Sequence, residues 1–595
     1  MKKLFLMLIA FVAVIAAEAA PALPTPTKVK QADGTWLTIQ QFGDEYFHWT
    51  STTDGLLVLP SDKGFVLADI DDDGQLHPTA TLAHDIAERS SQELVAVSRQ
   101  KTRLHLFKPE RIQSSRRAQI YDKSNYLQHE GTPKVLVILA EFQDVKFTLN
   151  DGNPKPVIEH YFTGTEMKSF GHSEEDMRYS VQEYFSKCSG GNFVPQFDIV
   201  GPVTLSHDMA YYGEDVSSTS YDKNFGSFCT ESISLVDDEV DFKQYDNDGD
   251  GKVELICIIY AGYGQNTNSS LPNTIWAKCT SQSYSTQDGV TVSHSNCSAE
   301  LFRYNEDFSQ VKANGTGVFL HEFSHGMGLP DIYPTTSSAY VNNQSMEYWD
   351  VMDLGCYGYN GFGPAAYTAW EQETFGWLEV EQLTASQEAI QMSPVLMGGK
   401  AYKFGNGAND EEWIYLENMQ LIDKSLRIPG SYPAHGLLVY HVAYPKSTMF
   451  MYDSPNDTPG KPAVAVVPAG GELICGYLVD GNTYTQNAYA KSLYSSAFPG
   501  MLENKVTSLT DDMNLPNYKF YNGEAATGVS LKNITEDTAT GVVTFDFVKT
   551  VPTAIKTIST VAEKAGGACY DLQGRWVASP TKGLYIQDGR KIVVK

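Results

Sequence analysis

The segment GVFLHEFSHGMGLPDIY (residues 317–333) contains the residues best suited to chemistry, His321, Glu322 and His325. Side chains four residues apart in a helix lie one turn apart on the same face, so both imidazoles can bind one ion. A catalytic zinc site uses three protein ligands and leaves one position open for water. The spacing therefore predicts a zinc site in which Glu322 takes a proton from the activated water and passes it to the leaving amine.

The third ligand is predicted from the residues that follow the helix. Gly328 can end the helix in a left-handed conformation and Pro330 prevents it from resuming, so the chain can bring Asp331 back to the same ion. Glu347 is the alternative, a distant glutamate of the type that thermolysin uses. Asp331 is preferred because a glycine at position 328 is explained if the chain reverses directly after the helix, as binding by Asp331 requires. The opposing interpretation, a structural helix with two satisfied histidines, is disfavoured by the full HExxHxxGxxD pattern.

A second element lies in YWDVMDLGCYG (residues 348–358), where Met352 follows Asp331 by 21 residues. Metzincin peptidases carry a methionine-containing turn together with an extended HExxHxxGxx motif. A lone buried methionine usually belongs to the core, but beside this motif Met352 is predicted to form such a turn. Tyr333 and Tyr357 are candidate donors to the oxyanion. An extended substrate peptide is expected to pair with an exposed sheet edge beside the cleft.

The stretch DNDGDGKVE (residues 246–254) is a second candidate metal site. Asp246, Asp248 and Asp250 alternate as hard-cation ligands and Glu254 falls at the ninth position of a calcium loop. The twelfth position, where such loops place a bidentate glutamate, is Cys257. The sequence therefore predicts a calcium site, with an acidic surface turn as the alternative.

The elements that must position these residues alternate in type along the chain. KVLVILAEF (residues 134–142) and LICIIY (255–260) have the continuous apolar pattern of strands buried on both faces, and residues 175–188 and 317–328 fit helices. Residues 21–98 predict short strands joined by Asp-Gly turns, and residues after Trp377 predict strands to about residue 550. The expected fold class is an α+β zincin- or metzincin-like catalytic domain, with a β-rich N-terminal pro-segment and a β-sandwich-like C-terminal domain.

Charge and the N-terminal residues limit the partners and the location. The chain has 595 residues and a net charge of −28 at pH 7, which argues against nucleic acid as the main partner because nucleic acid attracts basic clusters. Residues 1–20 resemble a signal peptide, and no later run approaches a membrane-spanning length of ~20 apolar residues. The protein is expected to be secreted or at the cell surface. Export permits disulfides, and Cys279 with Cys297 is a candidate pair among eight cysteines.

A basic connector interrupts the acidic chain after residue 98. Its cations are Arg99, Lys101, Arg103, Lys108, Arg111, Arg116 and Arg117. Two interpretations stay open, a solvated linker and a protease-sensitive joint between a pro-segment and a mature enzyme. Further along, His435 and His441 flank GLLVY and are expected to be ordinary core or surface histidines, because no ligand partners are spaced nearby.

The sequence resembles the immune inhibitor A family of secreted metallopeptidases over most of its length. GTWLTIQQFGDEYFHWTSTTDGLLV resembles the family's pro-segment and GLLVYHV a strand beyond the catalytic domain. Successive blocks of the catalytic domain are resembled by KVLVILAEFQDVKF, YFSKCSGGNFVPQFDIVGPVTL, YDNDGDGKVELICIIYAGYG, HEFSHGMGLPDIY and the WDVMDLG stretch. The resemblance implies a metzincin-type zinc endopeptidase made as a latent precursor. It assigns zinc to His321, His325 and Asp331, and the general base to Glu322. Asp353 departs from the pattern, because glycine is more usual after the methionine of the turn.

These observations predict five segments: a signal peptide (1–20), a pro-segment with basic linker (21–117), a catalytic domain (118–385), a β-rich C-terminal domain (386–550) and a tail (551–595). The tail, with YDLQGRWV and KGLYIQDGRKIVVK, resembles a type IX secretion sorting signal, which implies the secretion machinery as a partner. The expected function is cleavage of peptide bonds in extracellular protein or peptide substrates. The alternative is an inactive adhesin or binding protein on the same fold.

Overall fold

A computed structural model describes most of the chain. The described residues are 17–45, 47–107, 125–164, 179–215, 221–268, 271–303, 313–340, 343–405, 411–420, 435–445, 451–476, 485–500, 505–522, 526–550, 568–587 and 590–595. Within them, no helix combines the length and the apolar character that a membrane crossing requires.

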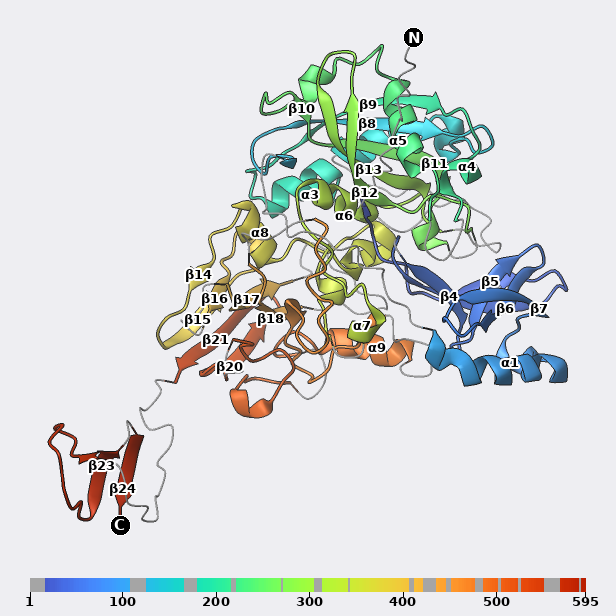
Figure 1. Cartoon of the computed structure of the whole chain (residues 1–595). Coiled ribbons are helices and arrows are strands. Elements are labelled where there is room, and N and C mark those ends of the chain that lie inside the picture. The colour runs from blue at the N-terminus through green and yellow to red at the C-terminus, as the bar shows by residue number, and fades with distance from the viewer. Residues whose placement is uncertain are drawn as a thin grey trace, which may run out of the picture.

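The N-terminal sheet is an antiparallel meander in which each strand pairs with the next (Figure 1). Its strands are β2 (Thr27–Lys30), β3 (Trp36–Gly43), β4 (His48–Thr52), β5 (Leu57–Ser61), β6 (Gly64–Ile70) and β7 (Leu76–Leu82). Three of its turns are Asp-Gly pairs, and Gly34, Gly55 and Gly74 adopt φ values of 89°, 78° and 81°, which glycine reaches at little cost. The predicted hairpins are confirmed.

The predicted basic connector is wrong at its start, because Arg99, Lys101 and Arg103 lie in helix α1 (Ser91–Arg103). This helix packs on the N-terminal sheet, and Arg99 and Arg103 pair with Asp69 and Asp72 at 2.9 and 2.6 Å. The basic residues here neutralise acidic residues of the sheet, an arrangement that the local sequence does not reveal. The remaining cations of the connector, Lys108, Arg111, Arg116 and Arg117, lie outside the described residues.

The central sheet has the strand order β1-β12-β13-β11-β8-β9, with β10 beside β13. Strands β9 (Gln196–Thr204), β8 (Lys134–Glu141), β11 (Ile256–Tyr263) and β13 (Thr291–Leu301) are parallel, and β12 (Lys278–Ser285) is antiparallel to β13. The short strands are β1 (Ala17–Glu18) and β10 (Lys252–Val253). The strands predicted at 134–142 and 255–260 are confirmed as β8 and β11.

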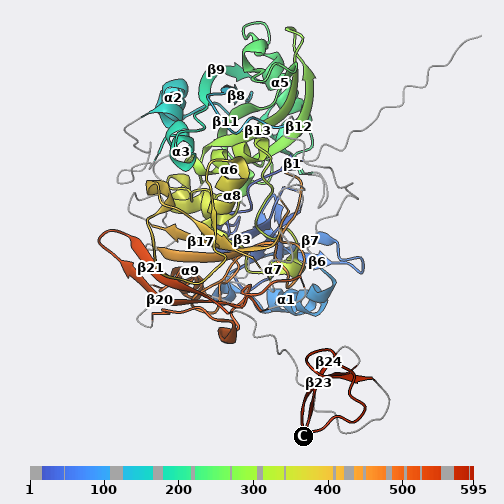
Figure 2. The ribbon, with the colours of Figure 1, turned by 90° about the vertical axis from the view of Figure 1, so that its left-hand side faces the viewer.

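Helices cover both faces of the central sheet, as Figures 1 and 2 show. On one face Val135, Val137 and Leu139 pack in the core that also contains α2 (Lys155–Thr163), α3 (Val181–Cys188) and α6 (Gly317–Gly326). On the other face Leu136 and Ile138 pack toward α5 (Phe225–Ser234), beside α4 (Met209–Gly213). Burial on both faces explains the uninterrupted apolar run of β8.

The expected Cys279–Cys297 disulfide is wrong. All eight cysteines are free and buried. In the β12–β13 register Cys279 lies opposite Asn296, and Cys297 lies opposite Lys278. The one-residue offset sends the two thiols to opposite faces of the sheet, and they belong to different hydrophobic cores.

The C-terminal region is built from two sheets that share one core. One contains β14 (Glu381–Gln382), β16 (Tyr402–Phe404), β17 (Trp413–Met419), β18 (Gly436–Val442) and β19 (Val464–Val466). The other contains β15 (Gln387–Met392), β20 (Val529–Asp537) and β21 (Val542–Lys549). Helices α7 (Ser337–Tyr340), α8 (Ala369–Phe375) and α9 (Gln486–Tyr494) complete the body. A small sheet of β22 (Cys569–Tyr570), β23 (Gly583–Gln587) and β24 (Arg590–Val594) ends the chain.

Candidate active site

Helix α6 is the buried centre of the molecule, and all ten of its residues are shielded from solvent. Glycines at its two ends allow close packing. A Cβ on Gly317 would collide with the carbonyl of Cys356, and a Cβ on Gly326 would press on the side chain of Leu255. The helix is therefore fixed between Leu255, which directly precedes strand β11, and the segment around Cys356.

The structure brings His321, His325 and Asp331 together. Asp331 Oδ1 lies 3.1 Å from His321 Nε2 and 3.4 Å from His325 Nε2, and the two Nε2 atoms are 3.2 Å apart. Three ligands in a tetrahedral zinc site, each about 2.0–2.1 Å from the metal, are separated by roughly 3.3 Å. The three atoms thus match three corners of a zinc tetrahedron.

The hydrogen bonds around these residues orient both imidazoles so that they could bind a cation. His321 Nδ1 donates to the carbonyl of Val351 and His325 Nδ1 to that of Leu329, each at 2.8 Å, so both Nε2 atoms present lone pairs. Asp331 Oδ2 is buried and accepts no hydrogen bond from any described residue. Two imidazole lone pairs and a carboxylate that converge at this spacing fit a bound metal.

The chain reversal occurs where the sequence predicts it. The helix ends at Gly326, and Gly328 has a φ of 100° with its N–H bonded to the carbonyl of His325 at 2.9 Å. This left-handed residue turns the chain so that Asp331 faces the histidines. Glu347, the alternative ligand, lies elsewhere: its carboxylate accepts from the amide of Gly476 and the hydroxyl of Tyr489 at 3.0 and 2.8 Å.

The segment around Met352 packs beneath the candidate metal ligands and holds two of their backbone and side-chain contacts. Met352 is fully buried, and its carbonyl accepts the N–H of Ile332 at 2.9 Å, directly beside Asp331. The preceding carbonyl, of Val351, accepts the hydrogen bond from His321 Nδ1 that orients this imidazole. Asp353, the departure from the family pattern, has a structural role. Its carboxylate accepts the backbone N–H groups of Met346, Glu347 and Leu354 at 3.1, 2.6 and 2.7 Å and so closes the loop before the turn.

Glu322 is fully buried beside the metal group, and burial raises its pKa well above the ordinary value. One carboxylate oxygen accepts the backbone N–H of Ala20 at 2.7 Å, and the other accepts no hydrogen bond from the described residues. Ala20 ends the segment that the sequence assigns to a signal peptide, of which residues 1–16 lie outside the described residues. Ala20 therefore lies directly against the candidate general base.

The covering segment, residues 17–23, is bound in an extended conformation. Strand β1 pairs antiparallel with the edge strand β12, with Ala17 opposite Thr280 (Figure 2). Side chains of the site then donate to three successive carbonyls. Tyr333 Oη bonds to Ala19 at 2.7 Å, Trp276 Nε1 to Ala20 at 2.9 Å and Tyr357 Oη to Pro21 at 2.6 Å. Sequence reasoning missed Trp276 and this segment, because only the fold brings their distant positions together.

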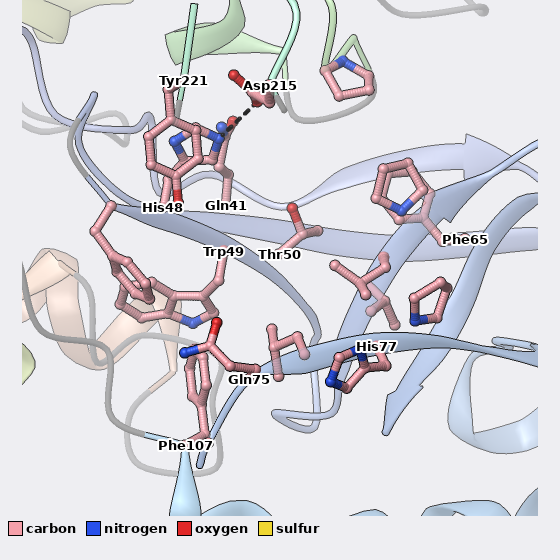
Figure 3. A pocket seen from close by; sticks show the side chains of 18 of the residues that line it. Gln41, His48, Trp49, Thr50, Phe65, Gln75, His77, Phe107, Asp215 and Tyr221 are labelled. Atoms are coloured by element: carbon pink, nitrogen blue, oxygen red, sulfur yellow. Dashed lines mark hydrogen bonds and ion pairs between the residues drawn. The ribbon is translucent and has the colours of Figure 1, made fainter. Parts of the chain in front are cut away.

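A cavity of about 1100 Å³ lies between the N-terminal sheet and the central domain. Figure 3 shows aromatic side chains of the N-terminal sheet, among them Trp49 and Phe65, on one side and Tyr221 and Asp215 on the other. His48 reaches across, with its Nε2 3.3 Å from Asp215 and its ring stacked on Trp276. The N-terminal sheet and the residues that hold the covering segment therefore contact each other.

The structure also gathers the second candidate group. Asp246, Asp248, Asp250 and Glu254 offer oxygens that all lie within 4.8 Å of one another. Among the residues that the structure describes, this group and the three residues of α6 and its reversal are the clusters able to hold a metal. His435 and His441 belong to neither cluster; they pair with Glu536 and Glu412 at 2.6 and 3.0 Å.

Residues 122–378 match the model of the immune inhibitor A peptidase M6 catalytic domain. The chain is similar to the pre-pro-metalloprotease PrtV of Vibrio cholerae, with 24% identity over 301 residues that cover 43% of this chain and 32% of the relative. It is also similar to immune inhibitor A of Bacillus thuringiensis subsp. alesti, with 23% identity over 274 residues, 41% of this chain and 39% of the relative. The matches thus span less than two fifths of each relative's length.

Proposed function

Because residues 122–378 form an immune inhibitor A-like metallopeptidase domain, we propose that this chain is a secreted zinc-dependent endopeptidase made as a latent precursor. The observation that carries the proposal is the convergence of His321, His325 and Asp331, whose lone pairs meet at the spacing of a tetrahedral zinc site. Residues 1–20 would serve as its signal peptide, which agrees with a location outside the cell.

Zinc held there would acidify a bound water and polarise the carbonyl of the bond to be cut. Glu322 would act as general base and then as general acid, because a carboxylate beside the metal can take the proton of the attacking water and return it to the departing amine. Its contact with the N–H of Ala20 at 2.7 Å supports this role. A group that reaches a backbone nitrogen in this segment can reach the nitrogen of a substrate in the same position.

Tyr333 and Tyr357 would have different roles toward substrate. Tyr333 donates to the carbonyl of Ala19, which is bonded to the nitrogen that Glu322 contacts, so it is suited to stabilise the developing oxyanion. Tyr357 donates two residues further along, to Pro21, and itself accepts from Asn266 at 3.0 Å. It is suited to hold the substrate backbone rather than the reacting carbonyl.

Protein or peptide substrates would bind as extended strands along the edge of β12. The antiparallel pairing of β1 with β12 supports this mode, because backbone hydrogen bonds to a sheet edge recognise any extended peptide. Once residues 1–20 are removed as the signal peptide, residues 21–23 of the covering segment remain. Ala22 is fully buried and Tyr357 donates to the carbonyl of Pro21 at 2.6 Å, so the precursor leaves no room for a second peptide at this position. Latency would follow from that occupation, and removal of residues 21–117 would release the site.

The terminal sheet β22–β24 and residues 551–595 as a whole would direct export through a sorting machinery. The similarity of YDLQGRWV and KGLYIQDGRKIVVK to a sorting signal supports this role, as does the separate small sheet in Figure 1. A chain that ends at Thr550 should accumulate inside the cell envelope with its peptidase domain folded. Secretion of that chain at the level of the full chain would contradict this role.

The test of the catalytic proposal is a pair of variants. Glu322→Gln should retain one zinc per chain and lose about 10²–10⁴-fold in kcat/KM on a peptide substrate, because it lacks the base but keeps the ligands. Asp331→Asn should lose zinc at a chelator concentration that the processed wild-type enzyme withstands. Full activity of Glu322→Gln would defeat the mechanism. A processed, zinc-loaded wild-type protein that cuts no peptide in a mixed library would favour the inactive binding protein instead.

A further inference from the structure

The loop at residues 246–254 links the short helix η5 (Phe242–Tyr245) to strand β11, at the end of the central sheet where β8 and β11 begin. Asp246, Asp248, Asp250 and Glu254 each offer one oxygen to a group whose members lie within 4.8 Å of one another. Oxygens on opposite sides of a calcium ion are about 4.6–5.2 Å apart, because each Ca–O distance is about 2.3–2.6 Å. The group therefore has the dimensions of a single ion site.

Glu254 distinguishes this loop from an acidic surface turn. Its side chain is only 3% exposed, and neither carboxylate oxygen accepts a hydrogen bond from a described residue. The neighbouring amide of Asn247 is occupied, since it donates to the carbonyls of Lys134 and Tyr245 at 3.1 and 3.0 Å. A buried carboxylate without donors is costly unless a cation binds it or a proton neutralises it.

We propose that Asp246, Asp248, Asp250 and Glu254 form a binding site for a hard divalent cation of the Ca²⁺ class. All four ligands are carboxylates, which suit calcium and disfavour zinc. Glu254 takes over the function that a glutamate at the twelfth position would have, because that position, Cys257, is buried within β11. This site lies outside the proposed zinc centre and does not depend on it.

The loop is held ready for an ion by its own backbone. Gly249 and Gly251 have φ values of 79° and 89°, and their N–H groups donate to Asp246 at 2.9 and 3.0 Å. Lys252 Nζ lies 3.1 Å from Asp250 Oδ2 and is the charge that a calcium ion would displace. These contacts fix the direction of the carboxylates before an ion arrives.

A cation here would stabilise the strands that support helix α6. Asn247 Oδ1 accepts the N–H of Lys134 at the start of β8 at 2.8 Å, and Gly251 accepts from Thr291 at the start of β13 at 3.0 Å. Leu255, next to Glu254, packs against Gly326 at the end of α6. The ion would therefore act on stability and on the resistance of the helix to local unfolding, not on the chemical step.

The first experiment uses the full-length Glu322→Gln precursor, which excludes self-cleavage, with the zinc site kept saturated. Calorimetric titration with CaCl₂ should show one site, and Tm should rise by roughly 5 °C when CaCl₂ is about 100-fold above Kd. MgCl₂ should give a smaller shift, because Mg²⁺ gives up its water ligands reluctantly. No binding heat and no change in Tm at about 5 mM CaCl₂ would overturn the proposal.

Variants locate the site. In the same Glu322→Gln background, Glu254→Gln and Asp248→Asn should each weaken calcium binding by at least about tenfold. Asp248 is exposed, so its substitution tests the site even if Glu254→Gln perturbs folding. The matched control is Asp73→Asn in the IDDDGQL turn (residues 70–76), which lacks a buried carboxylate and should leave calcium affinity unchanged. Wild-type affinity in both loop variants would overturn the assignment.

Discussion

The covering segment offers a direct test of latency, because Ala22 can be changed without altering any residue of the peptidase domain. Its side chain is fully buried among Phe42, Trp276 and Tyr340, and its N–H donates to the carbonyl of Gly43 at 2.8 Å. The substitution Ala22→Asp places a carboxyl in this apolar contact. We expect the segment to leave the site and the uncleaved precursor to become active.

The size of the effect follows from the cost of burying the new group. The cheapest bound form of Asp at this position is the neutral acid. Protonating a carboxyl of ordinary pKa 3.9 at about pH 7.5 costs about 5 kcal/mol. Since about 1.4 kcal/mol corresponds to a factor of ten, the ratio of uncovered to covered precursor should rise by on the order of 10³. Leaving the carboxylate charged and unpaired in the contact would cost more.

The assay is hydrolysis of a quenched fluorescent peptide by purified precursor, with electrophoresis to show that the chain is still intact. Thr25→Asp is the matched control, because it adds the same charge three residues further on at an exposed position and should stay latent. Ala22→Asp combined with Glu322→Gln should be silent, which excludes a contaminating protease. A folded Ala22→Asp precursor as latent as wild type would refute the occupation of the site as the cause of latency.

Three further predictions concern stability. Gly317→Ala should lower Tm by roughly 5 °C in a thermal melt, because its Cβ collides with the carbonyl of Cys356 and overpacking costs about 1–3 kcal/mol; an unchanged Tm would contradict the close approach. Burial raises the pKa of Glu417 to about 7, so the folded state holds a proton that the unfolded state releases above about pH 4.3, and stability falls as pH rises through 7. Glu417→Gln should therefore be more stable than wild type at about pH 8, by up to about 3 kcal/mol in urea unfolding, and not at about pH 4; an equal gain at both pH values would contradict this cause. Burial lowers the pKa of His294 to about 4, so below about pH 6.5 the unfolded state binds a proton that the folded state does not. The free energy of unfolding therefore decreases as pH falls from about 6.5 toward 4. In His294→Gln the loss of unfolding free energy between about pH 6.5 and pH 4, followed by circular dichroism, should be smaller than in wild type by up to about 3 kcal/mol. An unaltered acid transition would show that other groups control it.

The three proposed zinc ligands could be predicted from the sequence because they lie close together along the chain. His321 and His325 share a helix face by the helical period alone, and Gly328 marks the reversal that returns Asp331 within a few residues. The buried strands β8 and β11 could also be predicted from the sequence, since burial on both faces leaves an uninterrupted apolar run. These features need only short-range geometry.

Long-range features were misread or missed. The Cys279–Cys297 pairing failed because strand register, which local spacing does not reveal, sends the thiols to opposite faces. Arg99 and Arg103 lie in helix α1 and not in a solvated connector. Their acidic partners, Asp69 in strand β6 and Asp72 in the turn after it, are about thirty residues away, so the local sequence does not reveal the pairing. Asp353 departs from the family pattern for a structural reason, because its carboxylate accepts hydrogen bonds from three backbone N–H groups.

The sequence by itself determined which residues converge at the proposed zinc site, because a helix and one left-handed glycine bring His321, His325 and Asp331 together over eleven residues. Only the tertiary structure decided what lies over that group. Ala20 and Glu322 are 302 residues apart, and their contact depends on the packing of an entire N-terminal sheet against the central domain. No local pattern encodes such a contact, because it depends on packing between segments that are distant in the chain.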